Sequence, residues 1–319
     1  MDIIELNQEE IDQLLCISRE LELDDSFLNP ELFCRKARDI ALQIPERIVD
    51  HFSQIYQNGY LLFRGIPIEY LGETPENNTE NIGEKTQLAK IQGIFLHILG
   101  EIISFEAEGN GHLFQDIVPV KEMESQQTSI GSHHELEIHT EQAFSDLRPD
   151  FISLACIRGD PEAFTYILPV SRIIDNISES ELPILWKPFW KTGVDLSFKF
   201  WGQEFLKGDI RGPLAILNGT KENPHLIFDQ DLMTGITGEA HRKISEIVDI
   251  YYKHRIAYCL QPGEILILDN RKVVHGRSPF SPKYNGKDRF LIRAFGYTVK
   301  NYVKSENARN GRMILAKYS

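Results

Sequence analysis

The chain has 319 residues, of which 42% are hydrophobic and 10% aromatic, so it can bury a substantial core and does not have the composition of a disordered protein. Its formal net charge of −13 argues against a nucleic-acid partner, because phosphate binding needs a basic surface. Four cysteines without CxxC spacing, an acidic N-terminus without a signal-peptide pattern and no uninterrupted apolar stretch of membrane-spanning length predict a cytoplasmic protein with reduced thiols and no membrane contact.

The first hundred residues are predicted to be mainly helical. Asn7 and Glu10 have the spacing of a capping box at the start of one helix, and Asn58-Gly59 is a typical end for a second helix over residues 46–57. The remaining elements predicted for this part are a buried strand at 60–63, a polar loop at 73–84 and one long helix at 85–105.

From about Leu113 onward the pattern changes to short apolar runs separated by turn residues. Regularly spaced short strands favour a sandwich or a barrel. We find no internal repeat and no linker, so we expect a single domain over 1–319, in which 1–110 form a helical support and 111–300 a β core. The predicted strands are 151–157, 164–168, 214–217, 225–228, 257–260, 265–268 and 290–298, with one helix at 239–253.

A candidate metal site comes from His139-Thr140-Glu141 and His275. On a β-strand the side chains of His139 and Glu141 point to the same face. Two imidazoles and one carboxylate that block one face of an octahedron leave three positions open, as non-heme Fe(II) oxygenases require. A His-x-Glu tripeptide alone is weak evidence, since such residues are common on exposed strand faces. His275 strengthens it, because it follows an apolar strand and lies in a segment rich in His, Gly and Arg.

Two arginines on the last predicted strand indicate an anion site. Arg289 lies 14 residues after His275, and Arg289 and Arg293 share one face of an otherwise apolar strand. Buried there without anions they would be costly, and a guanidinium binds carboxylates bidentately. The alternative is a pair of surface arginines in salt bridges.

These motifs together carry a family resemblance. The set His-x-Glu, then Gln-Pro-Gly-Glu-x-Leu-x-x-Asp-Asn-x-x-x-x-His-Gly-Arg-Ser-Pro-Phe, then Asp-Arg-Phe-Leu-x-Arg closely resembles the clavaminate synthase-like Fe(II)/2-oxoglutarate oxygenases, over roughly residues 110–298. This family includes hydroxylases of free asparagine, arginine and lysine, and Glu141 in place of the commoner Asp is a mark of the subgroup. The resemblance implies a mainly β protein with flanking helices and a double-stranded β-helix core, which is a cupin-like jelly-roll.

The resemblance also implies roles for individual residues. Fe(II) would be the metal, with 2-oxoglutarate and O2 as co-substrates and succinate and CO2 as products. Its implied site residues are His139, Glu141 and His275 as catalytic metal ligands, Arg289 for the C5 carboxylate of 2-oxoglutarate, Thr165 as an aid to co-substrate binding, Arg293 for the α-carboxylate of an amino-acid substrate, Ser129 for the substrate backbone groups and Gln115 for its α-amine.

Asp229 and Asp231 bear on the choice of substrate. They follow an apolar run with period-2 spacing, and two carboxylates near a buried pocket need a cation. In relatives that hydroxylate arginine, acidic residues at about this position hold the cationic side chain. A basic amino acid is therefore favoured over asparagine, although a solvated turn is the alternative. The resemblance favours L-lysine, oxidised at C4 with C3 as competitor; L-arginine and L-asparagine are the alternatives within the family.

Other interpretations stay open at this point. Residues 195–211, with Phe198, Phe200, Trp201, Phe205, Gly208 and Asp209, have the composition of an active-site lid or of an ordinary packed loop. A zinc hydrolase could use the same His-Glu-His set, but it has no need for Arg289, and the sequence contains no HExxH. A non-catalytic amino-acid-binding protein is a second rival, against which the complete set of ligands argues. The oligomeric state stays open, a homo-oligomer included.

Overall fold

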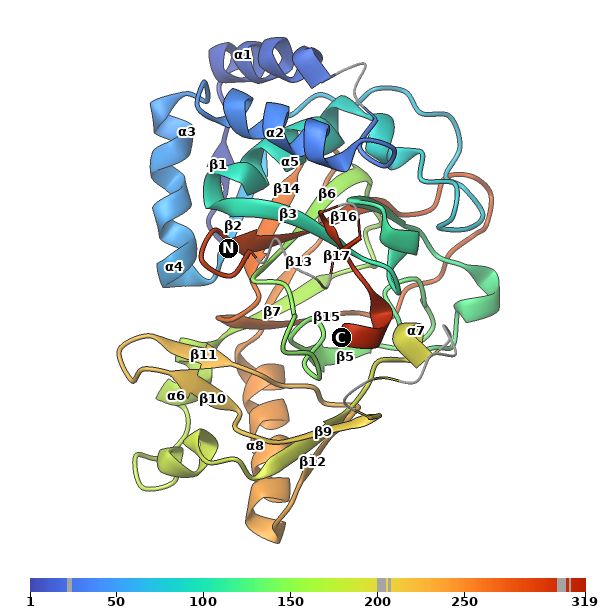
Figure 1. Cartoon of the computed structure of the whole chain (residues 1–319). Coiled ribbons are helices and arrows are strands. Elements are labelled where there is room, and N and C mark those ends of the chain that lie inside the picture. Colours follow the sequence, from blue (N-terminus) through green and yellow to red (C-terminus); the bar gives the residue numbers. More distant parts are fainter. Residues whose placement is uncertain (22–24, 200–204, 206–207, 303–307, 310) are drawn as a thin grey trace.

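Two β-sheets form the centre of the molecule (Figure 1). The computed structural model describes residues 1–21, 25–199, 205, 208–302, 308–309 and 311–319. In this part of the chain the larger sheet has nine strands, in the order β1 (Ile4–Glu5), β2 (Tyr60–Arg64), β14 (Ile265–Asp269), β6 (Phe151–Arg158), β16 (Phe290–Thr298), β3 (Gly100–Phe105), β18 (Met313–Ile314) and β17 (Ala308–Arg309), with β4 (Phe114–Ile117) also paired to β16. The smaller sheet has the order β13 (Ile256–Tyr258), β7 (Thr165–Pro169), β15 (Val273–Arg277) and β5 (Leu136–His139).

The core lies on both faces of the larger sheet, as the alternation along β14 shows. Ile265 and Ile267 pack with the N-terminal helices, whereas Leu266 and Leu268 pack toward the smaller sheet, beside Val273 of β15. This two-sheet core confirms the predicted double-stranded β-helix, which is also the fold of the structural relatives described below.

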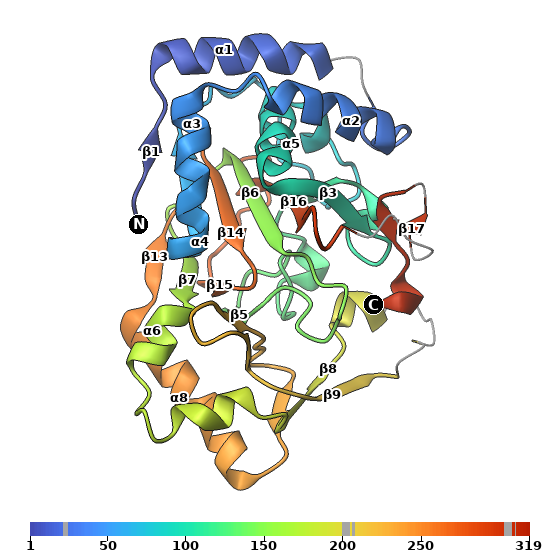
Figure 2. The same cartoon turned by 60° about the vertical axis from the view of Figure 1, so that its left-hand side comes forward.

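Helices from the first hundred residues cover the outer face of the larger sheet (Figure 2). The predicted capping box forms, because the Asn7 side chain accepts from the Glu10 backbone N–H at 3.0 Å and Glu10 accepts from the Asn7 N–H at 2.9 Å. The helix predicted at 46–57 also forms, with a 3₁₀ turn in its middle, and ends at Gly59 in the left-handed region. These helices are α1 (Gln8–Ser18), α2 (Pro30–Ala41), α3 (Glu46–His51), α4 (Ile55–Asn58) and α5 (Gln87–Leu99).

The prediction of a single long helix at 85–105 was wrong. α5 ends at Leu99, and Gly100–Phe105 form β3, which pairs antiparallel with β16. A side chain at Gly100 could not fit, because its Cβ would lie 1.9 Å from the carbonyl oxygen of Tyr297. The chain therefore changes from helix to strand at a position where only glycine allows the two backbones to approach. Pairing with a strand almost 200 residues away overrode the local helical pattern.

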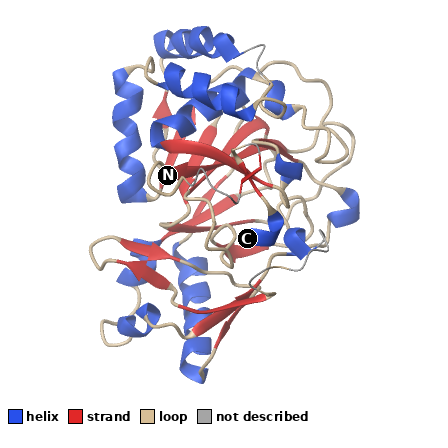
Figure 3. Cartoon of the chain, viewed as in Figure 1, coloured by secondary structure: helices blue, strands red, loops and turns tan. Residues whose placement is uncertain are grey.

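Most of the remaining elements lie below the smaller sheet in Figures 1 and 3, whereas the short helix Leu196–Lys199 lies beside it. The helix predicted at 239–253 is confirmed as α8, whereas the strands predicted at 214–217, 225–228 and 257–260 are shorter than expected or, for the first, divided between two strands. These elements are α6 (Val170–Asp175), β8 (Trp190–Gly193), α7 (Leu196–Lys199), β9 (Ile210–Leu214), β10 (Leu217–Gly219), β11 (Pro224–Leu226), β12 (Met233–Gly235) and α8 (Gly238–His254). Short 3₁₀ helices span Arg19–Leu21, Phe52–Gln54, Gly83–Lys85, Gly109–Gly111, Lys121–Met123, Leu182–Trp186 and Ala316–Tyr318.

Two further expectations can be compared with the described residues. Cys16, Cys34, Cys156 and Cys259 are all free thiols, as predicted. Throughout the described ranges, every helix is too short or too polar to cross a membrane.

Candidate active site

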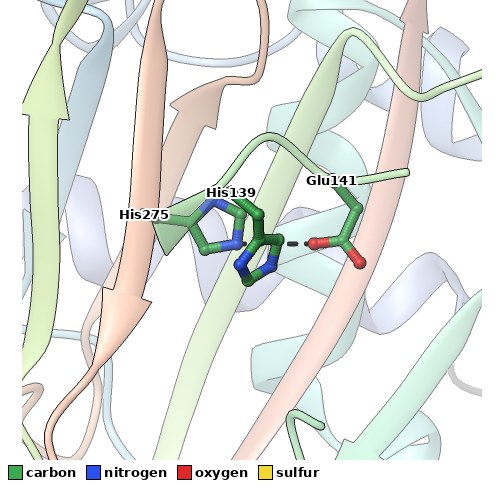
Figure 4. Close-up of side chains that lie close together, drawn as sticks. All are labelled: His139, Glu141 and His275. Carbon is green, nitrogen blue, oxygen red and sulfur yellow. Dashed lines mark ion pairs between the residues drawn. The ribbon is translucent and has the colours of Figure 1, made fainter. Parts of the chain in front are cut away.

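The predicted metal ligands meet between β5 and β15 (Figure 4). His139 ends β5 and is the register partner of His275 on β15, while Glu141 follows two residues after His139. One ligand atom from each of the three residues lies within 4.8 Å of the others. The His275 Nε2 to Glu141 Oε2 distance is 3.4 Å, and the two imidazole centroids are 4.5 Å apart. Residues 134 positions apart in sequence thus converge as one three-ligand set.

Hydrogen bonds with the Asn270 side chain hold the backbone of Glu141 in place after the end of β5. The Asn270 side chain accepts from the Glu141 N–H at 2.7 Å and donates to the Glu141 carbonyl at 3.1 Å. It also donates to the Pro149 carbonyl at 2.8 Å. Asn270 belongs to the Asp-Asn motif that carried the family resemblance, but sequence reasoning assigned it no role. Its place in the fold makes it a positioning residue for the carboxylate.

The protonation of these side chains suits a divalent metal. The Nδ1–H of His139 donates to the Glu137 carbonyl at 2.8 Å, which leaves Nε2 as the free lone pair. Burial, followed by the charge of His139, lowers the pKa of His275 and keeps its imidazole neutral. Burial works against ionisation of Glu141, but Arg293 and then His275 outweigh it and lower the pKa of Glu141 to about 2. A neutral imidazole at His275 and an ionised carboxylate at Glu141 are the forms that bind metal, and the Nε2 atom of His139 is free to join them, so the residues fit such an ion.

A cavity of about 550 Å³ surrounds this cluster. All ten predicted site residues line it, including the seven outside the metal set: Gln115, Ser129, Thr165, Asp229, Asp231, Arg289 and Arg293. Of the predicted lid, Asp195–Ser197 and Lys199 also line the cavity, as does Val194 directly before it, whereas Phe198 and Phe205 pack into the core behind it. Phe200 and Trp201 lie outside the described residues.

One end of the cavity is cationic. Arg289 is 7% exposed, and within the described ranges it makes no hydrogen bond or ion pair; burial lowers its pKa. Arg277 lies close enough for its charge to interact with that of Arg289, and burial followed by this repulsion lowers the pKa of Arg277 to about 9. Arg277 donates to the backbone carbonyls of Gly131, His134 and Ser278 rather than to an acid. A buried arginine without a carboxylate partner needs an anion, so this end fits one.

The other side of the cavity is acidic. Arg293 donates to Glu108 at 2.6 Å, to Glu141 at 3.0 Å and to Gln115 Oε1 at 2.8 and 3.1 Å. Burial raises the pKa of Glu108 to about 7 although Arg293 opposes the shift. Burial, followed by the charges of Asp229 and Glu108, raises the pKa of Asp195 well above its usual value. Carboxylates outnumber cations here, so this region favours a positively charged ligand.

Two of these acids were missed by sequence reasoning. Glu108 directly precedes a Gly-Asn-Gly turn before β4, and that turn was the signal that could have drawn attention to it. Asp195 was named only as the start of the lid segment. Neither belongs to a recognisable motif, because each reaches the cavity through the fold and not through local spacing.

Asp229 and Asp231 lie beside the metal cluster. Asp229 forms an isolated antiparallel bridge with His139, is 7% exposed and accepts from the Leu232 N–H at 2.7 Å; burial raises its pKa. Asp231 is exposed at the rim. Glu137 also lines the cavity here, and burial followed by the charges of Asp231 and Asp229 raises its pKa. The two aspartates therefore face the cavity and are not merely a solvated turn.

Comparisons with known proteins agree with this geometry. Residues 210–295 match the family described as taurine catabolism dioxygenase TauD, TfdA family. The chain is 42% identical to an L-lysine 3-hydroxylase of Catenulispora acidiphila, over 90% of this chain and 82% of that protein. It is 35% identical to an L-asparagine oxygenase of Streptomyces coelicolor, over 76% of this chain and 72% of that one. An asparagine oxygenase solved with Fe(II), 3-hydroxyasparagine and succinate superimposes with a TM-score of 0.87 at 28% identity, covering 98% of this chain and 99% of that one.

The superposition shows that the chain shares the fold of the asparagine oxygenase. The similarity extends over nearly the whole chain and is not confined to the motifs. The chain belongs to the clavaminate synthase-like family of iron- and 2-oxoglutarate-dependent oxygenases.

Proposed function

We propose that this enzyme hydroxylates the side chain of free L-lysine at C3, with 2-oxoglutarate and O2 as co-substrates. One observation carries the proposal. A single cavity holds the His139, Glu141 and His275 cluster, a buried arginine without a partner among the described residues at one end, and an excess of carboxylates at the other. The cationic end matches the free carboxylate of 2-oxoglutarate, and the acidic region matches an amino acid with a second positive charge.

His139, Glu141 and His275 would hold Fe(II). When bound, iron and 2-oxoglutarate supply the oxidation: O2 and 2-oxoglutarate give succinate and CO2, and one oxygen atom enters a C–H bond of the substrate. Arg289 would bind the C5 carboxylate of 2-oxoglutarate, with the Thr165 hydroxyl beside it. Thr165 is the register partner of Arg277, so it lies at the cationic end of the cavity.

Four residues would hold the backbone groups of the amino acid: Gln115 of β4, Arg293 of β16, Ser129 and Glu108. Arg293 is the cation available for the α-carboxylate, and Ser129 lines the same cavity. Gln115 Oε1 already accepts two N–H groups of Arg293, while its buried Nε2 has no partner among the described residues. That free donor suits a carboxylate oxygen better than an amine, so we assign the α-ammonium to Glu108 and move Gln115 to the carboxylate.

Apolar residues complete the cavity and exclude water from the reacting groups. Ile117, Leu154 and Leu291 of the larger sheet and Val194 before α7 all line it. They limit where the aliphatic part of the substrate can lie, and so choose which carbon faces the metal ligands.

We assign the hydroxylation to C3 because of the similarity of the chain to its named relatives. The relative at 42% identity is named an L-lysine 3-hydroxylase, and three relatives named L-lysine 4-hydroxylases are 23% to 25% identical. The higher identity to the 3-hydroxylase favours C3. The family resemblance of the motifs had favoured C4. Asp229 and Asp231 support lysine over asparagine, because an amide side chain would leave both carboxylates without a cation.

The test is a substrate panel. Protein loaded with Fe(II) without oxygen is given 2-oxoglutarate, O2 and each of the twenty amino acids, and succinate and a product 16 mass units heavier are measured. We expect lysine to give both in equal amounts, with the new hydroxyl at C3 by NMR. A product from asparagine alone would refute the substrate assignment, and activity with zinc but without iron would favour a hydrolase. The His275→Ala variant should lose iron and product together.

We also propose the setting in which the enzyme works. Residues 1–319 would act as one domain, since one apolar cluster joins the N-terminal helices to β14 and β16. Four free thiols suit the cytoplasm, where thiols stay reduced.

A further inference from the structure

We propose that Glu137 completes a three-carboxylate receptor for the ε-ammonium group of lysine, together with Asp229 and Asp231, and that Glu137 sets the preference for lysine over arginine. This inference rests on the proposed function. No motif pointed to Glu137, which lies two residues before the first metal ligand.

The backbone register places Glu137 on the face that looks into the cavity. His139 bridges Asp229, the Thr140 N–H donates to the Phe228 carbonyl at 2.7 Å, and the Gln230 N–H donates to the Ile138 carbonyl at 3.0 Å. These contacts pair the segment before Glu141 with the segment that ends at Asp229, and Asp231 lies in the turn that follows, close enough for its charge to act on that of Glu137. Because side chains alternate along a strand, Glu137 and His139 point to the same side. In these two segments the cavity is lined by Glu137, His139, Asp229 and Asp231. It is not lined by Ile138, Thr140, Phe228 or Gln230.

Among the described residues, no ion pair neutralises any of the three carboxylates. Like charges held close together are destabilising. Within the described ranges the Glu137 side chain makes no ion pair, and Lys199, which lines the same cavity, pairs with none of the three acids. The contrast is Glu135, two residues earlier, whose carboxylate is neutralised by Arg255 at 2.8 Å. An acidic group alone is not a site; this one shares its cavity with the His-Glu-His cluster, and a relative at 42% identity is named for lysine.

The spacing fits the length of a lysine side chain. Glu137 and His139 are one two-residue step apart, or about 7 Å along the strand. Four single bonds of about 1.5 Å separate the Cβ and Nζ atoms of lysine, which span roughly 5 Å when extended. A C3 carbon held beside the metal ligands would therefore bring the ammonium group to the three acids. Ornithine, one methylene shorter, would fall short of Glu137 and Asp231.

The number of acids suits an ammonium group better than a guanidinium. An ammonium group has three N–H donors that point in different directions, and three separate carboxylates can each accept one. A guanidinium is planar and pairs best with one or two carboxylates in its own plane. Removing Glu137 should therefore harm lysine more than arginine.

The test compares Glu137→Gln with Glu135→Gln. Glutamine keeps the size of the side chain and removes the charge, and Glu135 lies outside the cavity lining. For each protein, kcat and KM are measured with L-lysine, L-arginine and L-norleucine, which lacks the ammonium group. In Glu137→Gln we expect kcat/KM for lysine to fall about 10- to 100-fold, mostly through KM. The ratio of lysine to norleucine should fall by the same factor, and the ratio of lysine to arginine should also fall. Glu135→Gln should keep the wild-type ratios.

The outcomes separate this inference from the proposed function. If the wild-type enzyme does not hydroxylate lysine, the proposed function fails. If it does, but Glu137→Gln keeps the wild-type ratio of lysine to norleucine, Glu137 is not part of the receptor. Equal changes of that ratio in both variants would also overturn the inference, since they would report a general effect of charge. Both ratios are internal to one protein, so partial loss of iron or of folded enzyme does not mask the result.

Discussion

Replacing Arg289 with methionine should raise the stability of the protein without 2-oxoglutarate and, at the same time, weaken the binding of that co-substrate. Arg289 is 7% exposed and makes no hydrogen bond or ion pair with the described residues. In the absence of 2-oxoglutarate it is therefore a desolvated cation, and an apolar side chain of similar length removes that cost. The opposite signs make this prediction specific, because simple damage to the fold would lower both stability and affinity.

The sizes of the two effects follow separately from the protein without and with bound 2-oxoglutarate. Replacing uncompensated buried charge with apolar groups gains on the order of 1 to 3 kcal/mol in the empty protein. With 2-oxoglutarate bound, the variant leaves a carboxylate without its counter-charge, a loss of about 2 to 5 kcal/mol. That loss corresponds to roughly a 30- to 4,000-fold weaker Kd. The stabilisation that the co-substrate gives the folded protein should shrink accordingly.

Thermal unfolding with and without 2-oxoglutarate, together with calorimetric titration under nitrogen in the presence of Fe(II), measures both effects. Arg277→Met is the matched control, because Arg277 donates to three backbone carbonyls that the variant would leave unpaired. We expect Arg277→Met to unfold at a lower temperature than the wild type and Arg289→Met at a higher one. Unchanged affinity for 2-oxoglutarate in Arg289→Met, or destabilisation like that of the control, would refute the reasoning.

Three further predictions concern the support of the site and the pH dependence of stability. Asn270→Ala removes three buried hydrogen bonds around Glu141 and should weaken iron binding by equilibrium dialysis while the fold persists by circular dichroism; unchanged iron affinity would contradict its positioning role. Gly100→Ala would place a Cβ 1.9 Å from the Tyr297 carbonyl oxygen and should destabilise the protein by several kcal/mol, roughly 3 or more, in urea unfolding; a cost below 1 would argue against the β3–β16 pairing. Burial lowers the pKa of His97 from 6.5 to about 4, so the unfolded chain binds the proton more tightly and stability should decline, by on the order of 3 kcal/mol, as the pH falls from 6.5 to about 4. His97→Gln should flatten that part of the stability curve, and an unchanged slope would assign it to other groups.

Local patterns predicted those parts of the fold that depend on nearby residues. The Asn7 cap and the helix end at Gly59 formed as expected, because each is set by a few neighbouring residues, and the apolar run at 290–298 formed the strand β16. The helix predicted at 85–105 failed at Gly100, where a distant strand determined the outcome. Propensity is a weak guide where tertiary pairing is strong.

The residues of the site also fall into two groups, those that the sequence predicted and those that only the structure revealed. All ten predicted residues line one cavity, because metal ligands and anion-binding arginines need particular residue types at recognisable spacings. Glu108, Glu137 and Asp195 could not be found like this. Each is an ordinary acid in sequence, and only the cavity shows that it faces other carboxylates.

Residue types and spacings in the chain were enough to predict an iron- and 2-oxoglutarate-dependent oxygenase, because His139, Glu141, His275 and Arg289 stand in the motifs that carry the family resemblance. The charge distribution around the substrate depends on the packing, because the fold brings the acids of separate segments within reach of one another and gives Arg289 no partner among the described residues. Residue type and spacing follow from the chain, whereas burial and the balance of charges depend on which distant segments pack together.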